Sequence, residues 1–165
     1  MEEKEANQQM QQMQQTINVN VAPNNQNQVQ YIPALKLRTN RGLLKLILLG
    51  IITLGIYPLA VYSHISSEIN FVAGRYDGKH TMHYCLIVFI FSWLTLGIAP
   101  IVWAHRICAR IGDELIRRNI AYDFGAADFW LWGVLGYFII VGPFVWQHKW
   151  MKAMNLLNAD YNLKG

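Results

Sequence analysis

Three apolar blocks alternate with polar segments over most of this chain, and this pattern predicts its helices. The blocks cover residues 43–62, 84–103 and 129–146. Each contains about 18 to 20 residues, the number that crosses a bilayer core of roughly 30 Å as a helix. We therefore predict an all-helical integral membrane protein.

A Gly and Pro break recurs inside each block. Pro58, Pro100 and Pro143 lie about 42 residues apart, and a period of this size is typical of repeat proteins. An aromatic residue and then a histidine follow each proline. We predict three tandem helix-break-helix repeats, over about 39–76, 77–122 and 123–160.

The expected helix starts are good N-cap residues placed before each block, namely Thr39 or Asn40, Thr81 and Asp128. Beyond each break, apolar residues recur every three or four positions, which predicts an amphipathic helix lying on the membrane surface. The apolar faces are Tyr62, Ile65, Ile69 and Val72, then Trp103, Ile107, Ile111 and Leu115, then Trp146, Trp150, Met154 and Leu157. Arg106 and Arg110 are assigned to the polar face of the second helix.

Two topologies fit this pattern. In one, each block is a single kinked transmembrane helix, so that successive copies face opposite sides of the membrane. In the other, each repeat is a helical hairpin that turns back before it crosses, because Gly and Pro end a helix at the break. Only hairpins keep all three copies in one orientation, and the sequence leaves both topologies open.

The composition agrees with a membrane protein, since 53% of the residues are hydrophobic and only 15% are charged. The net charge of +4 is concentrated beside the apolar blocks, which favours contact with anionic headgroups over nucleic-acid binding. Cys85 and Cys108 do not make a disulfide framework.

Residues 1–34 are rich in Gln and Asn, and we predict a disordered tether that recruits a protein partner. Within this tail, the alternation over 17–21 leaves open a strand that pairs with a second copy. The start of the chain has no signal-peptide pattern, so the first apolar block is expected to act as the insertion signal.

One segment carries a family resemblance. It reads Leu-Gly-Ile-Ile-Thr-Leu-Gly-Ile-Tyr from Leu49 to Tyr57, and the amphipathic stretch after it ends in Glu68-Ile69-Asn70. With the Gln/Asn-rich leader, it resembles the bacterial membrane family called domain of unknown function 4234, most strongly over about 38–75. The later repeats depart from the pattern at Ala99-Pro100 and Gly142-Pro143. The resemblance implies a bacterial integral membrane protein with no established activity.

The histidines are the main candidates for chemistry. His64, His105 and His148 would make a metal or proton-relay site if the repeats packed around a common axis. Their places beside aromatic residues at the block ends favour interfacial anchoring instead. His80, His83 and Cys85 form a second local cluster, which the expected helix start explains without a metal.

Other features argue against catalysis or ion transport. Intramembrane charges are the usual mark of an ion path. The acidic residues of this chain are assigned to connections and polar faces rather than to apolar blocks, and among them are Asp77, Asp113, Glu114, Asp123 and Asp128. No phosphate-binding loop, catalytic serine motif or carboxylate pair is present. The glycines of the blocks suit either packing within one chain or close helix approach in an assembly, and they are Gly50, Gly55, Gly97, Gly133, Gly136 and Gly142.

From the sequence we therefore expect a non-enzymatic membrane scaffold or accessory subunit without cofactor or metal. It comprises a tail at 1–34 and a membrane domain at 35–165. The alternative is a homo-oligomeric pore or small-solute carrier. The expected partners are membrane lipids, further copies of the chain and a protein bound by the tail, and the expected location is a bacterial inner membrane.

Overall fold

The structure, a computed structural model, describes residues 36–165, and this part of the chain contains helices and no strands. The predicted tether at 1–34 and the alternating segment at 17–21 lie outside the described residues. The elements are α2 (Leu43–Ile52), α3 (Ile56–Asp77), α4 (Tyr84–Leu86), the π-helical η1 (Ile87–Phe91), α5 (Ser92–Leu94), α6 (Ile98–Arg117), α7 (Ala126–Asp128), the π-helical η2 (Phe129–Val134), the 3₁₀-helical η3 (Leu135–Ile139) and α8 (Gly142–Lys164).

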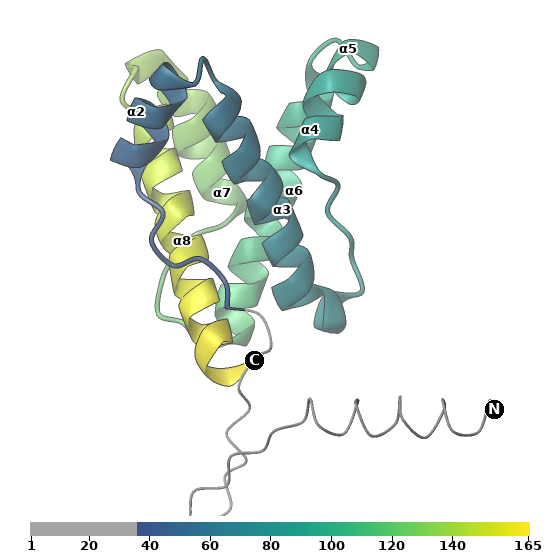
Figure 1. The fold of residues 1–165 in the computed structure, drawn as a ribbon, viewed down its shortest axis with the longest axis vertical. Helices are drawn as coiled ribbons and strands as arrows, with labels where there is room; N and C mark the ends of the chain where they lie inside the picture. Colours follow the sequence, from purple (N-terminus) through teal and green to yellow (C-terminus); the bar gives the residue numbers. More distant parts are fainter. Residues whose placement is uncertain (1–35) are drawn as a thin grey trace, which may run out of the picture.

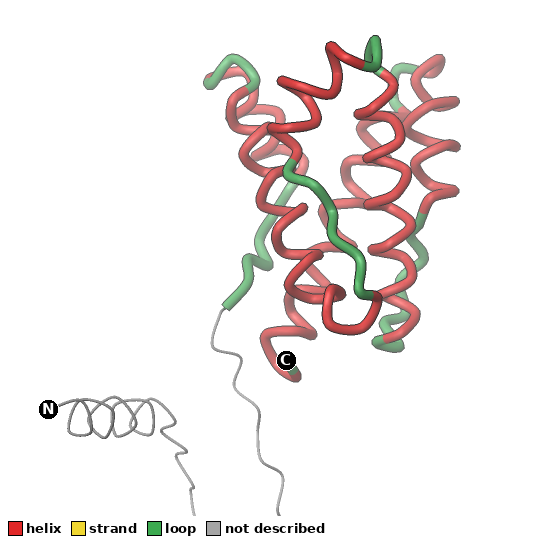
Figure 2. The backbone as a smooth tube through the Cα atoms, turned by 90° about the vertical axis from the view of Figure 1, so that its right-hand side faces the viewer, coloured by secondary structure: helices red, strands yellow, loops and turns green. Residues whose placement is uncertain are grey.

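Within residues 36–165 the chain reverses direction at 53–55, 95–97 and 140–141. Each reversal joins a first arm to a long helix, so that α2 packs on α3, η1 on α6 and η2 on α8. We call these pairs hairpins 1, 2 and 3. All three turns lie at one end of the molecule, the upper end in Figure 1 and Figure 2. We call it the turn end and the opposite end the connection end.

This arrangement is the geometry of the hairpin topology. The expected helix breaks are present, because the arms before the breaks are separate elements from the long helices after them. None of the helices described over 36–165 combines the length and the apolarity that a membrane crossing requires.

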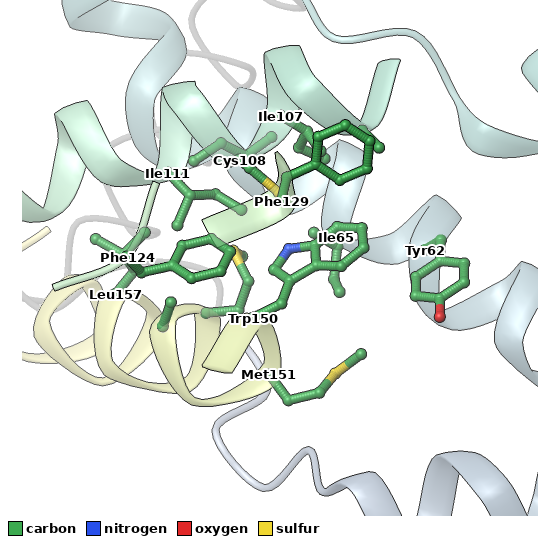
Figure 3. Close-up of a cluster of buried hydrophobic side chains, with 14 of the residues drawn as sticks. Tyr62, Ile65, Ile107, Cys108, Ile111, Phe124, Phe129, Trp150, Met151 and Leu157 are labelled. Carbon is green, nitrogen blue, oxygen red and sulfur yellow. The ribbon is translucent and has the colours of Figure 1, made fainter. Parts of the chain in front are cut away.

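The core lies where the long helices α3, α6 and α8 meet (Figure 3). Ile65, Ile107, Ile111 and Leu157 are fully or almost fully buried there, and Trp150 stacks on the ring of Tyr62 at 5.2 Å between centroids. Removing a side chain of this size from water contributes roughly 1.5 to 3 kcal/mol. The three long helices are therefore held together by a conventional hydrophobic core.

This core corrects one expectation. The apolar faces of the amphipathic helices were expected to lie on the membrane surface, whereas the structure turns most of them toward one another. Hairpins in a single orientation place equivalent apolar stripes side by side, and three such stripes bury one another. A stripe on a single helix has the same spacing whether it faces lipid or a neighbouring helix.

The expected helix starts were also wrong by two or three residues. The first helix of hairpin 1 begins after Gly42 and that of hairpin 2 after His83. Asp128 lies inside the first turn of α7, where its carboxylate accepts a hydrogen bond from the N–H of Gly125 at 3.0 Å.

Asparagine side chains on the long helices hold the extended segments in place. Asn70 donates to the carbonyl of Thr81 at 2.8 Å and accepts from its N–H at 2.7 Å. On α8, Asn155 makes the same pair of bonds with Arg41, and Asn162 makes it with Leu37. A primary amide offers one donor side and one acceptor side, so it can satisfy an extended residue without a partner strand.

Arg110 of α6 fixes the connection between hairpins 1 and 2. Its five N–H groups bond both carboxylate oxygens of Asp77, the Asn70 and Thr81 side chains and the Lys79 carbonyl. This side chain is only 6% exposed, so its expected place on a polar surface was wrong. A fully saturated guanidinium ties three points of the connection to one helix.

We predict that Arg110→Leu lowers the free energy of unfolding by about 2 to 4 kcal/mol, because it leaves the Asp77 carboxylate without its cation. Arg106→Leu, on an exposed position of the same helix, should change it by less than about 0.5 kcal/mol. Thermal unfolding in a mild detergent, followed by circular dichroism, measures both. Equal effects of the two changes would contradict this account of Arg110.

The same ion pair predicts a pH dependence. Partial burial alone would raise the pKa of Asp77, but the hydrogen bonds from Arg110 and the Lys79 N–H outweigh it and lower this pKa below its usual 3.8. The stabilisation is therefore complete above the usual carboxyl range and is lost as the pH falls through the lowered value. We expect Asp77→Asn to be less stable at neutral pH and to lose less stability than the wild type below about pH 4.

Candidate functional site

The turn end exposes a large apolar surface. Leu54 and Leu96 are each 93% exposed, and Trp93, Phe138 and Ile140 project there almost as far. Soluble monomers rarely expose contiguous apolar patches above a few hundred Å². This surface is the first candidate for a functional site, because nothing within residues 36–165 covers it.

Charged residues are absent from the segments that build this surface. Residues 46–67, 80–105 and 129–148 contain no Asp, Glu, Lys or Arg. At the helical rise, the long helices run about 12 to 20 Å from the turns to their first charged residues, Glu68, Arg106 and Lys149. Half of a bilayer's hydrocarbon core is about 15 Å thick, so the uncharged part of each hairpin matches one leaflet.

The turns of hairpins 1 and 2 have the same backbone geometry. Leu54 and Leu96 are left-handed, with φ of 51° and 50°, and each is followed by a left-handed glycine. Gly55 N–H donates to the Gly50 carbonyl at 2.8 Å and Leu54 N–H to Ile51 at 3.2 Å, and hairpin 2 repeats both bonds. This is a Schellman motif in which leucine stands at the position usually taken by glycine.

The two turns also satisfy their own N–H groups. In hairpin 1 the N–H groups of residues 53–56 donate to backbone carbonyls, and that of Tyr57 donates to the Thr53 hydroxyl at 2.9 Å. Pro58 has no N–H to satisfy. In hairpin 2 the N–H groups of residues 95–98 donate to backbone carbonyls and that of Ala99 donates to the Thr95 hydroxyl. Pro100, like Pro58, has no N–H. No backbone N–H of residues 53–58 or 95–100 therefore depends on water.

The third turn has different chemistry. Ile140 combines a positive φ of 62° with ψ of −42°, outside the left-handed helical region, and is 77% exposed. Gly136 and Gly142 pack backbone against backbone, so that a Cβ on either would collide with the other. These two glycines serve packing within the monomer, one of the two roles that the sequence left open.

The structure does not bring the three repeat histidines together. His64 and His148 are exposed on different hairpins, and His105 accepts a hydrogen bond from the Trp130 indole at 3.1 Å. Among residues 36–165, no three His, Cys, Asp or Glu side chains lie close enough to share a metal ion. The alternative of a site shared by the three histidines is therefore wrong, because the space between the three long helices is filled by the hydrophobic core.

The second candidate cluster, His80, His83 and Cys85, does not form a shared site either, because two of its members bond to different serines of α3. His83 lies 3.0 Å from the Ser67 hydroxyl, and the Cys85 sulfur lies 3.1 Å from the Ser63 hydroxyl. Both bonds hold the first arm of hairpin 2 against α3.

Not every acidic residue lies on a polar surface as expected. Glu114 is buried between Arg117 and Arg118, and the buried Asp128 pairs with Lys149. Seven cations have no carboxylate within ion-pair distance among the described residues, namely Lys45, Lys79, Arg106, Lys36, Arg38, Arg75 and Lys152. The first three lie at the ends of uncharged segments.

Residues 41–113 match the family model described as Domain of unknown function (DUF4234). This match confirms the resemblance found in the first repeat and extends it through most of hairpin 2. Both Thr-Leu-Gly turns lie within the DUF4234 match, whereas hairpin 3 lies outside it. Comparisons with curated proteins and with solved structures gave no match.

Sequence reasoning overlooked the two leucines as functional candidates. Leu54 and Leu96 belong to the motif that carries the resemblance, but apolar residues in an apolar block attract no notice. The available signal was the Leu-Gly pair at the end of a helix, which places a leucine where the backbone favours glycine.

The two cysteines should differ in reactivity. Burial raises the pKa of the Cys108 thiol to about 12, so it stays protonated and inaccessible at neutral pH, whereas Cys85 is partly exposed. We expect a maleimide to label one thiol per folded chain in detergent, and Cys85→Ser to abolish this labelling. Cys108→Ser should leave it unchanged, and mass spectrometry counts the labels.

Proposed function

We propose that this protein is a non-enzymatic membrane scaffold whose three hairpins enter a single leaflet with the turn end first. One observation carries the proposal. The turns of hairpins 1 and 2 expose a left-handed leucine while every backbone N–H of the turn is already bonded within the chain.

The leucines are unfavourable in water on two counts. A left-handed conformation costs an L-residue roughly 1 to 2 kcal/mol, and glycine at the same position would avoid that cost. Almost complete exposure adds the hydration cost of an apolar side chain. Transfer of a leucine side chain into hydrocarbon returns about 2 kcal/mol, so contact with lipid offsets the strain.

The bonded turns suit the same environment. An unsatisfied backbone group costs several kcal/mol in hydrocarbon, so an irregular turn is tolerated there only when its donors are satisfied. Both turns meet this condition, over residues 53–58 and 95–100. The threonine hydroxyl accepts one N–H that has no carbonyl partner, and the proline that follows has no N–H to satisfy.

The cations at the ends of the uncharged segments support the same depth of insertion. Lys45, Lys79 and Arg106 are exposed there, at the level that anionic headgroups would occupy. His64 and His148 are exposed and lie near the ends of the uncharged segments 46–67 and 129–148. These positions agree with anchoring at the interface.

A scaffold fits these features better than a pore. A pore needs polar side chains along its path, and the uncharged segments 46–67, 80–105 and 129–148 offer few. In this proposal the connection end and the tether at 1–34 remain outside the hydrocarbon, where they bind a protein partner or further copies of the chain. The family resemblance supports a bacterial inner membrane as the site.

We predict that the double change Leu54→Asn and Leu96→Asn reduces binding of the full chain to anionic liposomes at least tenfold. Burying an unpaired amide costs about 2 kcal/mol or more, and 1.4 kcal/mol already equals a factor of ten. Asparagine tolerates the left-handed backbone, so the helix content should not change. Flotation on a density gradient measures binding, and circular dichroism measures helix content.

The matched control is Ile116→Asn with Leu163→Asn, because both residues are highly exposed and apolar but lie near the ends of α6 and α8 at the connection end. This variant should float like the wild type. If the turn variant also floats like the wild type, the hairpins do not insert by their turns and the proposal fails.

A further inference from the structure

A cavity of about 800 Å³ runs along hairpin 2, between α6 and the segment that precedes it. Its walls extend from Thr95 near the turn to Asp113 near the connection end. Along α6 alone, from Ile98 to Asp113, this is about 22 Å at the helical rise. One leaflet with its headgroups has nearly the same thickness.

The cavity is apolar at one end and basic at the other. Ile87, Phe91, Ile98 and Val102 line the part nearer the turn. Residues 79–81 and Arg106 line the part nearer the connection end. A ligand that fills both parts must have a hydrocarbon chain and a polar group at its end.

The charges at the basic end select the polar group. Arg110 also lines the cavity, but its five donors are taken by the connection, so it is unavailable to a ligand. Lys79 and Arg106 are exposed, and no side-chain bond or ion pair to either cationic group is present within residues 36–165. Asp113 is the one carboxylate of this lining, so two available cations face a single acid. Lysine and arginine together are well suited to a phosphate group.

The smaller cavity beside α2, of about 560 Å³, makes a weaker case. Arg41 and Lys152 line it, but the Arg41 guanidinium already pairs with Glu68 at 2.5 Å and the Lys152 ammonium lies over the Tyr122 ring at 5.0 Å, so no pair of available cations faces this cavity. The cavity of hairpin 2 is therefore the better candidate for a ligand site.

We infer that the cavity of hairpin 2 binds one phospholipid, with its phosphate between Lys79 and Arg106 and an acyl chain along Phe91, Ile98 and Val102. The inference rests on the proposed insertion into one leaflet, because that insertion brings the cavity to the depth of the lipids.

The test uses the full chain in a non-ionic detergent with dioleoyl phosphatidylglycerol as the probe, and native mass spectrometry measures the tightest-bound lipid. Lys79→Glu with Arg106→Glu should raise its apparent Kd at least tenfold. Val102→Trp, which fills the apolar part from an exposed position, should do the same without changing the charge. The control with the same charge change, Lys36→Glu with Arg75→Glu, alters exposed cations outside the cavity and should leave the Kd unchanged.

Two results would overturn the inference. One is an unchanged Kd in both cavity variants, and the other is equal competition by inorganic phosphate, which would make the site a simple anion site. Liposome flotation separates this test from that of the proposed function, since Val102→Trp should float normally while it loses the bound lipid. Wild-type protein that binds the lipid in detergent but does not float would refute insertion and leave the lipid site standing.

Discussion

The buried guanidinium of Arg110 is the constraint on which the arrangement of the hairpins depends. Its bonds to Asp77, Thr81 and the Lys79 carbonyl hold the first connection against α6. The connection therefore stays at one end, and hairpin 2 must start from there and point the same way as hairpin 1. Arg118, which bonds both Glu114 and Asp160, ties the end of α6 to α8 in a similar way.

A shared orientation has two consequences for the rest of the structure. It aligns the apolar stripes of α3, α6 and α8, which then form the core. It also gathers the uncharged turns at one end and the ion pairs at the other. The asymmetry that supports insertion into a leaflet, and the gradient from apolar to basic along the cavity of hairpin 2, both follow from this alignment.

Much of the secondary structure and part of the candidate site were predictable. Three predictions depended on local sequence: the all-helical class, the breaks at Gly and Pro, and the family resemblance. The structure agrees with the first two over residues 36–165, and the family match agrees with the third. The start expected at Thr81 was missed because Thr81 engages Asn70 and Arg110, which lie far away in sequence. A side chain that could cap the adjacent helix can instead bond to residues far away in sequence, and the sequence does not reveal those partners.

The sequence by itself determined where the chain is helical, where its helices break and which segments carry no charge, because these features depend on residues close to one another, but it left open whether the chain turns back at each break. The tertiary structure alone decided which face of each amphipathic helix is covered by a neighbouring helix. It also buried Arg110, Glu114 and Asp128. It also separated His64, His105 and His148. The physical reason is that an apolar stripe or a charged side chain has no intrinsic partner, and only the packing of the three hairpins assigns one.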